Sequence, residues 1–433
     1  MRSWFPLTSC LLRLTSHLLP LIVFMAAPAA AQSDSALERA RRLLESAPLI
    51  DGHNDLPWEI RESKTAPRDV AAYDLWARSP KHTDLQRLAD GKVGAQFWSI
   101  YLPGDMRDSG YARVQLEQFD IVRRMIARYP DRLALALTAS DIERNFKRGR
   151  IGSLLGMEGG HAIENSLGAL RSYYELGARY MTLTHNVTLD WADAALDTAR
   201  HNGLTPFGKE VVREMNRLGM LVDLSHVSPA VMRDALDVTE APVIFSHSSA
   251  RALTNHPRNV PDAILARLSK NGGVVMVTFV PAFVSPDAAA WDTESRRQLE
   301  QLEKTVSDTA ERRRLLDEWK AAHPQPRATL AQVADHIEHV RKVAGADHVG
   351  IGSDFDGIDT VPEGLEDVSS FPYLFAELIR RGWSDTDLRK LAGGNLLRAL
   401  KAAESTAARL RKTRQPSTKT IEQLDGSHAS AVP

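Results

Sequence analysis

The sequence predicts a (β/α)8 barrel, the TIM-type α/β fold in which eight parallel strands alternate with helices. The first observation is that short apolar runs recur along the chain, with amphipathic helical segments between them. Runs that are apolar on both faces are typical of parallel strands buried on each side. The second observation is that polar residues able to bind metals or move protons follow most of these runs. The runs begin with Leu49–Asp55 and continue with Val93–Tyr101, Gly152–Met157, Tyr180–Thr184, Leu221–Leu224, Val243–Phe245, Gly273–Phe279 and Val349–Ile351. An open doubly wound sheet is the alternative, but no G-x-G-x-x-G turn supports it.

Composition places the chain among soluble globular proteins. Of its 433 residues, 43% are hydrophobic and 25% are charged, and 54 Lys and Arg residues nearly balance 55 Asp and Glu residues. A nucleic-acid partner usually requires a basic surface, and this composition gives such a partner no support. The strand–helix alternation favours a single domain at residues 32–411.

The first 31 residues have the pattern of a secretory signal peptide. Arg2 supplies positive charge, Leu18–Ala27 is an apolar run, and Ala29–Ala31 satisfies the small-residue rule for cleavage after Ala31. The run is short for a bilayer span, and an uncleaved anchor is the alternative. Cleavage removes Cys10, the only cysteine, so the mature chain can form no disulfide. We expect a periplasmic or secreted protein without a stable membrane anchor.

The first predicted strand ends in a histidine and a carboxylate two residues apart. Residues i and i+2 of a strand point to the same side, so His53 and Asp55 aim an imidazole and a carboxylate at one point. Pro57 cannot continue a central strand, which leaves both groups at its mouth. Taken alone, such a pair is more often a buried histidine hydrogen-bonded to a nearby aspartate. Taken with the rest of the chain, it predicts metal binding.

Two later segments depart from the strand–helix alternation. Asp287–Pro326 is charged and helix-prone, and we expect a helical insertion or partial lid there. Residues 412–433 are polar and contain Pro416 and Gly426, so we expect a disordered tail. Between these segments, Ser384 precedes an acidic first turn and is expected to cap a helix.

Seven residues at the ends of six predicted strands form the candidate site. They are His53, Asp55, Glu158, His185, His226, His247 and Asp354. Each alone has a structural alternative, such as a hydrogen-bonded core histidine or a turn carboxylate. In a barrel, however, the carboxyl ends of the strands converge on one mouth. Several buried carboxylates that lie together need counter-charges, and a cation supplies them economically.

The size of this set favours two metal ions over one, since it exceeds what a single four-coordinate zinc ion uses. A carboxylate shared by two ions ~3.5–4 Å apart is the usual arrangement of hydrolytic two-metal sites. Such a pair lowers the pKa of a bridging water and polarises the scissile carbonyl. Nitrogen and oxygen ligands suit zinc, with manganese or cobalt as alternatives. Spacing alone leaves open which residue bridges the ions.

Ordered motifs then show a resemblance to the membrane (renal-type) dipeptidases over about residues 48–400. The motifs are DGHNDLPW at 51–58, VGAQFWSIY at 93–101, GMEGGH at 156–161, LTHN at 183–186, WAD at 191–193, DLSHV at 223–227, IFSHSSAR at 244–251, HPRNVPD at 256–262, GIGSDFDG at 350–357 and GNLLR at 394–398. The resemblance implies a (β/α)8 zinc metallopeptidase. It implies that His53 and Asp55 bind a first Zn²⁺, that Glu158 bridges two Zn²⁺ ions, and that His226 and His247 bind the second.

The resemblance also implies the catalytic and substrate-binding roles. Asp354 would be the acid/base, His185 would stabilise the oxyanion, and Arg258 would pair with the carboxylate of the substrate. Asp356 either holds a ligand in place or only shapes its turn. The chain lacks the disulfides and lipid anchor of the animal enzymes, so a noncovalent homodimer is the dimer left open. Phe283 stands where some relatives place a tyrosine.

The site residues and the resemblance together predict an exported dizinc dipeptidase whose substrate is a small dipeptide. The resemblance implies that the dipeptide is L-L or L-D and that some β-lactams are opened. N-acyl amino acids, cell-wall fragments and β-lactams are alternative substrates for the same machinery. The alternative of another class is a periplasmic binding protein or pseudoenzyme. A binding module has no use for Asp354 as an acid/base, which argues against this alternative.

Overall fold

The computed structural model describes residues 29–106 and 110–426, and the side chains from residue 35 onward. The expected signal peptide therefore lies almost wholly outside the described residues. Helix α1 (Ala29–Ser46) begins just before the expected cleavage point and runs through it. Within the described part of the chain, no helix is both long enough and apolar enough to cross a membrane.

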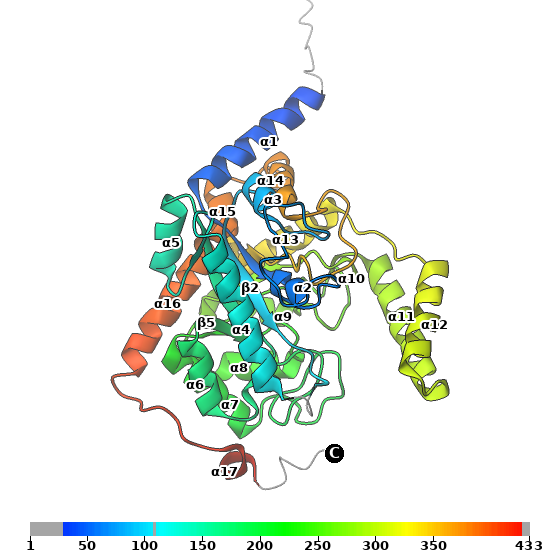
Figure 1. The fold of residues 1–433 in the computed structure, drawn as a ribbon. Coiled ribbons are helices and arrows are strands. Elements are labelled where there is room, and N and C mark those ends of the chain that lie inside the picture. Colours follow the sequence, from blue (N-terminus) through cyan, green and yellow to red (C-terminus); the bar gives the residue numbers. More distant parts are fainter. Residues whose placement is uncertain (1–28, 107–109, 427–433) are drawn as a thin grey trace, which may run out of the picture.

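Eight parallel strands close into a barrel at the centre of the molecule (Figure 1). Around the barrel, each strand pairs with the next in the order β1, β2, β4, β5, β6, β7, β8 and β9, and β9 pairs back with β1. The strands are β1 (Leu49–Asn54), β2 (Val93–Tyr101), β4 (Ile151–Glu158), β5 (Ala178–Thr182), β6 (Leu221–Asp223), β7 (Ile244–Phe245), β8 (Val274–Val277) and β9 (Val349–Ile351). Each corresponds to one of the predicted apolar runs, which confirms the (β/α)8 fold.

The structure adds a ninth strand that the sequence analysis did not predict. Strand β3 (Leu133–Leu135) lies outside the closed barrel and pairs with the first three residues of β4, Ile151–Ser153. Strand β5 pairs with β4 only from Leu155 onward, which leaves that edge of β4 free for β3. A three-residue strand gives too short an apolar run to be separated from the loop around it.

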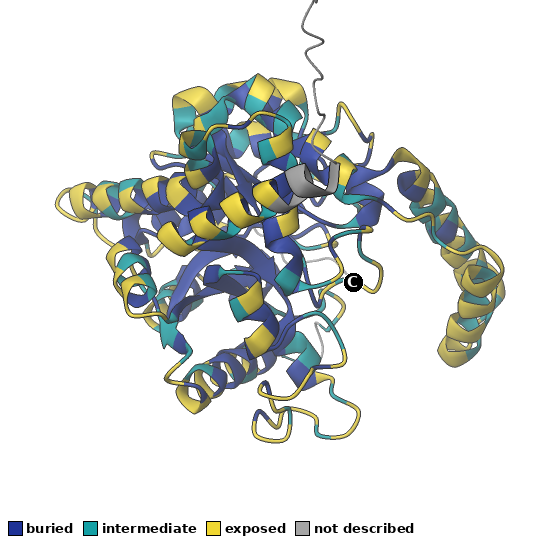
Figure 2. Cartoon of the chain, turned by 90° about the horizontal axis from the view of Figure 1, so that it is seen from above, coloured by how far each residue is buried: buried dark blue, intermediate teal, exposed yellow. Residues whose placement is uncertain are grey.

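Helices cover the outside of the barrel, with buried faces toward the strands and exposed faces outward (Figure 2). They are α3 (Leu85–Asp90), α4 (Tyr111–Arg128), α5 (Ala139–Lys147), α6 (Leu167–Glu175), α7 (Pro206–Leu218), α8 (Pro229–Val238), α9 (Asp262–Asn271), α13 (Leu330–Ala344), α14 (Phe371–Arg380), α15 (Asp385–Arg389) and α16 (Asn395–Leu410). The short helices α2 (Leu56–Arg61) and α10 (Pro281–Val284) instead contribute residues to a cavity at the mouth of the barrel. The Ser384 side chain caps α15 by accepting a hydrogen bond from the Asp387 amide, as its position in the sequence predicts.

Two further helices form a hairpin that stands away from the barrel (Figures 1 and 2). These are α11 (Pro286–Thr305) and α12 (Thr309–Ala322), and they occupy the segment for which the sequence predicts a helical insertion. Helix α12 has no buried residue. The base of the hairpin is held by aromatic contacts, with the rings of Trp291 and Trp319 5.8 Å apart.

Residues 412–426 differ from the disorder expected of a polar tail. Helix α17 (Ile421–Asp425) lies against α7, and Ile421 is only 2% exposed. The Phe207 amide donates to Asp425 Oδ1 at 2.9 Å, and the Arg171 guanidinium donates to the Ser417 carbonyl at 2.8 Å. One apolar anchor and a few hydrogen bonds order the segment, and average composition does not reveal so local an arrangement.

Two buried carboxylates join strands whose backbone pairing is shortest. Strands β6 and β7 pair through a single residue pair, Asp223 and Ile244. The Asp223 side chain accepts hydrogen bonds from the Ser246 amide, from the Ser246 hydroxyl at 2.6 Å and from the Thr182 hydroxyl at 2.5 Å. Asp51 does the same between β1 and β9, because it accepts from both the amide and the hydroxyl of Ser353. These side chains replace the missing ladder hydrogen bonds.

The substitution Asp223→Ala should therefore destabilise the barrel strongly. It leaves the buried donors of Thr182 and Ser246 without their acceptor, and we expect a loss of about 3 kcal/mol or more in the free energy of unfolding. Thermal unfolding followed by circular dichroism measures the loss. Asp120→Ala removes an exposed carboxylate that pairs with Arg124 on α4 and should change stability little. Equal melting temperatures for the two variants would contradict the role of Asp223.

Candidate metal centre

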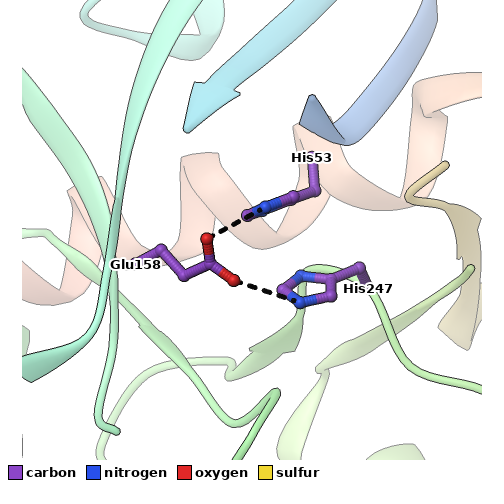
Figure 3. Close-up of side chains that lie close together, drawn as sticks. All are labelled: His53, Glu158 and His247. Carbon is purple, nitrogen blue, oxygen red and sulfur yellow. Dashed lines mark ion pairs between the residues drawn. The ribbon is translucent and has the colours of Figure 1, made fainter. Parts of the chain in front are cut away.

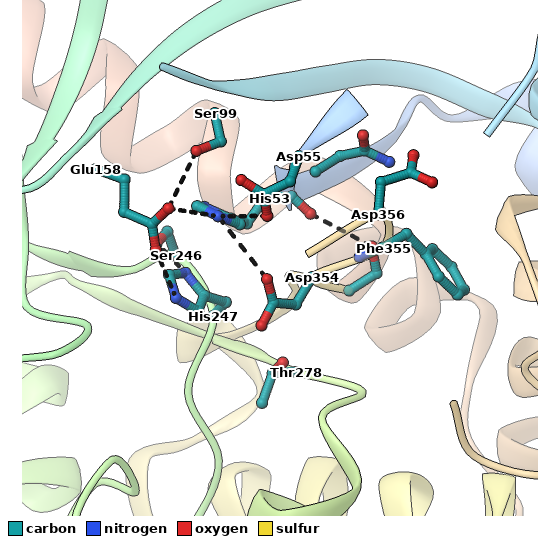
Figure 4. A network of polar contacts seen from close by, with 12 residues as sticks. His53, Asp55, Ser99, Glu158, Ser246, His247, Thr278, Asp354, Phe355 and Asp356 are labelled. Atoms are coloured by element: carbon teal, nitrogen blue, oxygen red, sulfur yellow. Dashed lines mark hydrogen bonds and ion pairs between the residues drawn. The ribbon is translucent and has the colours of Figure 1, made fainter. Parts of the chain in front are cut away.

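The seven predicted strand-end residues converge on the mouth of the barrel. Figure 4 shows five of them: His53, Asp55, Glu158, His247 and Asp354. His53 lies in β1, Asp55 follows β1, and Glu158 is the last residue of β4. His185, His226, His247 and Asp354 lie in the loops that follow β5, β6, β7 and β9. Together they form three overlapping groups whose nitrogen and oxygen atoms lie within 4.8 Å of one another. The eighth predicted residue, Arg258, lies beside them between β7 and α9 and lines the same cavity.

Glu158 lies at the centre of the cluster, and its two oxygens face different histidines (Figure 3). Oε2 lies 3.4 Å from His53 Nε2 and accepts a hydrogen bond from the Ser99 hydroxyl. Oε1 lies 3.0 Å from His226 Nε2 and 3.5 Å from His247 Nε2. Burial alone would raise the pKa of Glu158, but the surrounding imidazoles outweigh burial and hold this pKa well below its usual range.

His53 has one partnered and one unpartnered ring nitrogen. Its Nδ1 lies 2.8 Å from the Tyr180 hydroxyl, which has the Gly52 carbonyl as an acceptor for its own proton. Its buried Nε2 has no hydrogen-bond partner and lies 3.2 Å from Asp55 Oδ2. Burial lowers the pKa of His53, but the nearby carboxylates of Glu158 and Asp55 raise it well above its usual value. The position in front of Nε2 therefore attracts a positive charge.

His226 and His247 direct two lone pairs toward the same place. His226 Nδ1 donates to the side-chain oxygen Oδ1 of Asn186 at 3.0 Å. Nε2 of the neutral His226 ring therefore carries no proton. His247 Nδ1 donates to the Ser246 hydroxyl oxygen, because that hydroxyl gives its own proton to Asp223. Burial lowers the pKa of both histidines well below its usual value. Their Nε2 atoms nevertheless lie 2.8 Å apart, an arrangement that favours a cation between them and Glu158.

The donor set thus fits metal ions. Zinc and related ions are usually bound by carboxylates and by neutral imidazoles. The second ring nitrogen of such an imidazole makes a hydrogen bond that fixes its orientation. His53 with Asp55 and Glu158 can hold one cation, and Glu158 with His226 and His247 can hold another. The whole cavity has a volume of about 750 Å³ and is lined by Asp55, Glu158, His226 and His247 and also by residues of α11.

Backbone conformation in the loops aims two of these residues. His226 has φ of 66° and Asp354 has φ of 67°, in the left-handed region that non-glycine residues seldom adopt. Gly357 allows the close approach of the same loop, because a Cβ atom there would lie 2.3 Å from Asp55 Oδ2. Such backbone strain recurs at functional sites, where the surrounding structure holds it in place.

Asp354 lies slightly apart from the central ligands, with Oδ1 3.9 Å from His53 Nε2. Burial raises the pKa of Asp354 to about 8, aided by the charges of Asp55 and Glu158 and opposed by those of His53 and Arg258. In the absence of a cation this carboxyl therefore tends to hold a proton. The neighbouring Asp356 turns its carboxylate away from Glu158 (Figure 4) and accepts a hydrogen bond from the His82 amide, so it shapes its loop.

His185 and Arg258 face the cavity from two sides. His185 Nε2 lies 3.9 Å from Glu158 Oε1, and burial lowers the pKa of this histidine. The Arg258 side chain is almost wholly buried, and its hydrogen bonds to Ser248 and to the His247 carbonyl are long, at 3.5 Å each. It forms an ion pair with no carboxylate in the described part of the chain. A buried guanidinium without a counter-ion is suited to an anionic ligand.

The sequence analysis missed the residues that orient the histidines. These are Tyr180, Asn186 and Ser246, and the last two belong to the motifs LTHN and IFSHSSAR that it quoted. No motif drew attention to Tyr180, because it lies within an apolar strand and looks like a core residue. Gly156 makes room for it, since a Cβ atom there would lie 2.0 Å from the Tyr180 ring.

The barrel and its site define the class of protein, a metal-dependent hydrolase with its ligands at the carboxyl ends of the strands. The model of the membrane dipeptidase family, peptidase family M19, matches residues 37–414. The chain belongs to this family, which confirms the resemblance seen in its motifs, and is a metal-dependent dipeptidase.

Solved structures with the same fold include dipeptidases. The probable dipeptidase PvdM from Pseudomonas aeruginosa has 24% sequence identity and a TM-score of 0.75, with 86% of this chain and 100% of that chain covered. A metallopeptidase from Rhodobacter sphaeroides, liganded with a phosphinate mimic of the dipeptide L-Ala-D-Ala, has 25% identity and a TM-score of 0.68. That comparison covers 82% of this chain and 99% of the other.

Zinc should stabilise the folded protein, because it neutralises carboxylates that face one another. At a free zinc concentration about 100 times its Kd, one site adds about 2.7 kcal/mol to the free energy of unfolding. Calorimetry of chelator-treated protein, before and after zinc is restored, should show a higher melting temperature with zinc. Glu158→Gln should lose most of this increase, whereas Glu294→Gln on the surface of α11 should keep it. An undiminished increase in Glu158→Gln would contradict the central position of Glu158.

Proposed function

We propose that this protein is a dizinc dipeptidase that hydrolyses the peptide bond of L-L and L-D dipeptides. The observation that carries the proposal is that Glu158 presents one oxygen to His53 and the other to His226 and His247. This is the arrangement required of a carboxylate shared between two ions. The ligand assignment is His53 and Asp55 for the first Zn²⁺ and His226 and His247 for the second, bridged by Glu158.

The remaining residues surround the position for a scissile bond. When bound, the two cations supply the Lewis acidity that polarises the substrate carbonyl and lowers the pKa of a water molecule. Asp354 takes a proton at its carboxylate and delivers it to the nitrogen of the leaving amine. His185 donates a hydrogen bond from Nε2 to the carbonyl oxygen as negative charge develops there. Neutral imidazole suits this task, and the lowered pKa of His185 keeps it neutral.

Arg258 gives the site its preference for a free carboxylate. Its guanidinium is buried, faces the cavity and has no counter-ion among the described residues. The C-terminal carboxylate of a dipeptide supplies that charge through charge-assisted hydrogen bonds. Tolerance of a D-residue at this position is supported by the Rhodobacter sphaeroides metallopeptidase, whose bound phosphinate mimics L-Ala-D-Ala.

We further propose that the protein is exported and released by cleavage after Ala31. The support is in the sequence, where Arg2, the apolar run Leu18–Ala27 and the alanines at positions 29–31 follow the secretory pattern. The mature protein then carries no cysteine. Its partner is a small dipeptide, and a noncovalent homodimer is compatible with its cysteine-free sequence.

The central test is hydrolysis of L-Ala-L-Ala and L-Ala-D-Ala by the purified mature protein. We expect both peptides to be cleaved, the activity to disappear after chelation, and zinc to restore it, because the cations polarise the carbonyl. N-acetylated L-Ala-D-Ala serves as the comparison for acylated substrates. If the folded, zinc-loaded protein cleaves only the acetylated compound, its substrate is an N-acyl amino acid. Cleavage of none of the three would contradict the enzyme assignment.

Asp354→Asn separates an acid/base from a metal ligand. The amide cannot carry the transferred proton, so we expect kcat to fall at least ~100-fold. Zinc content, measured by elemental analysis after gel filtration, should stay at the wild-type value. Asp55→Asn should lower zinc content as well as kcat. A parallel loss of zinc in Asp354→Asn would make this residue a ligand instead.

A further inference from the structure

The guanidinium of Arg258 is held weakly, although its position matters for an anionic substrate group. Its two hydrogen bonds are long, at 3.5 Å each, and its Nε has no hydrogen-bond partner among the described residues. The other support is the ring of Phe283, whose centroid lies 5.0 Å from Arg258 Cζ. A phenylalanine ring offers only its face and can make no hydrogen bond to the guanidinium. Other residues must therefore fix this part of the cavity.

His256 contacts both Arg258 and Phe283. Its Nδ1 accepts a hydrogen bond from the Arg258 backbone amide at 3.2 Å. Its ring stacks on Phe283, with centroids 4.5 Å apart and planes inclined by 29°. His256 is buried, and burial lowers its pKa, so the ring is neutral. Because Nδ1 accepts, the proton of the neutral ring is on Nε2.

The acceptor for that proton comes from the inserted hairpin. His256 Nε2 donates to Asp292 Oδ2 at 3.2 Å, and Asp292 lies in the second turn of α11. Arg296, one helical turn later, donates to the same oxygen at 2.6 Å, and its Nη2 also lies 3.1 Å from His256 Nε2. Since His256 Nε2 carries the ring proton and a guanidinium only donates, Arg296 is bonded to Asp292 and merely lies beside the ring. The other charged residues of the hairpin that line the cavity are Arg296 and Lys320, while Lys81 elsewhere in the lining is paired with Glu59. Asp292 is therefore held ionised and fixed, and it orients the His256 ring.

We propose that Asp292 is a positioning residue through which the α11–α12 hairpin sets the place of Arg258 and so the recognition of a C-terminal carboxylate. The path runs from Asp292 to the His256 ring, and from that ring to the Arg258 amide and to Phe283. The inserted hairpin is thus part of the substrate site. The inference rests on the proposed role of Arg258 as the carboxylate-binding residue.

The test compares a dipeptide with its C-terminal amide, which lacks the carboxylate. The KM and kcat of L-Ala-L-Ala and the Ki of L-Ala-L-Ala amide against it are measured for the wild type, Asp292→Ala, Asp292→Asn and Arg258→Ala. In Asp292→Ala we expect KM to rise about tenfold, kcat to change less than about threefold, and Ki of the amide to stay constant. Asp292→Asn keeps one acceptor oxygen and should lie between wild type and Asp292→Ala.

Controls separate positioning from a general structural effect. Glu294→Ala removes an acidic residue of the same helix, whose carboxylate pairs with Arg297 away from the cavity, and should leave KM and Ki unchanged. In the Arg258→Ala background, Asp292→Ala should raise KM no further, because the residue that it positions is gone.

The possible results have distinct meanings. A proportional rise of KM and Ki in Asp292→Ala, or no change in either, overturns the positioning role while the dipeptidase assignment stands. If Arg258→Ala leaves the ratio of Ki to KM at the wild-type value, the carboxylate role of Arg258 is wrong, and this inference falls with it. Loss of kcat in Arg258→Ala at constant KM would have the same consequence.

Discussion

The chemistry at the mouth of this barrel depends on the Glu158 carboxylate and the imidazoles on its two sides. A buried carboxylate with His53 at one oxygen and His226 at the other is stable only if positive charge is present on both sides. Strand pairing makes this possible, because β4 pairs continuously with β2 up to Glu158 itself. Glu158, which the other site residues face, is therefore held in place by a strand and not by a loop.

The histidines around it depend on a layer of polar residues just below the mouth. Asp223 orders Ser246, and Ser246 in turn orients His247, so the same carboxylate both joins two strands and sets the tautomer of His247. Tyr180, in β5, orients His53 in the same way, through its hydroxyl next to His53 Nδ1. Stability and ligand geometry are for this reason inseparable in the upper barrel.

The sequence revealed those parts of the structure that depend on local pattern. His53 and Asp55 follow from the two-residue repeat of a strand, and Glu158 follows from its place at a strand end. It could not reveal Tyr180 beside His53, because the two are 127 residues apart and a tyrosine in an apolar strand looks like core. The pairing of Asp292 with His256 was hidden for the same reason, since sequence distance carries no information on contact. The roles assigned to the individual site residues remain predictions.

The outer half of the α11–α12 hairpin makes few contacts that stabilise the fold. Its base is tied to the cavity by Asp292 and to itself by Trp291 and Trp319, whereas α12 buries no residue and the turn between Thr305 and Thr309 is exposed. Changes of length at that turn cost the fold little. The turn is thus a natural point for attaching a reporter domain, because its residues make no contribution to the buried core.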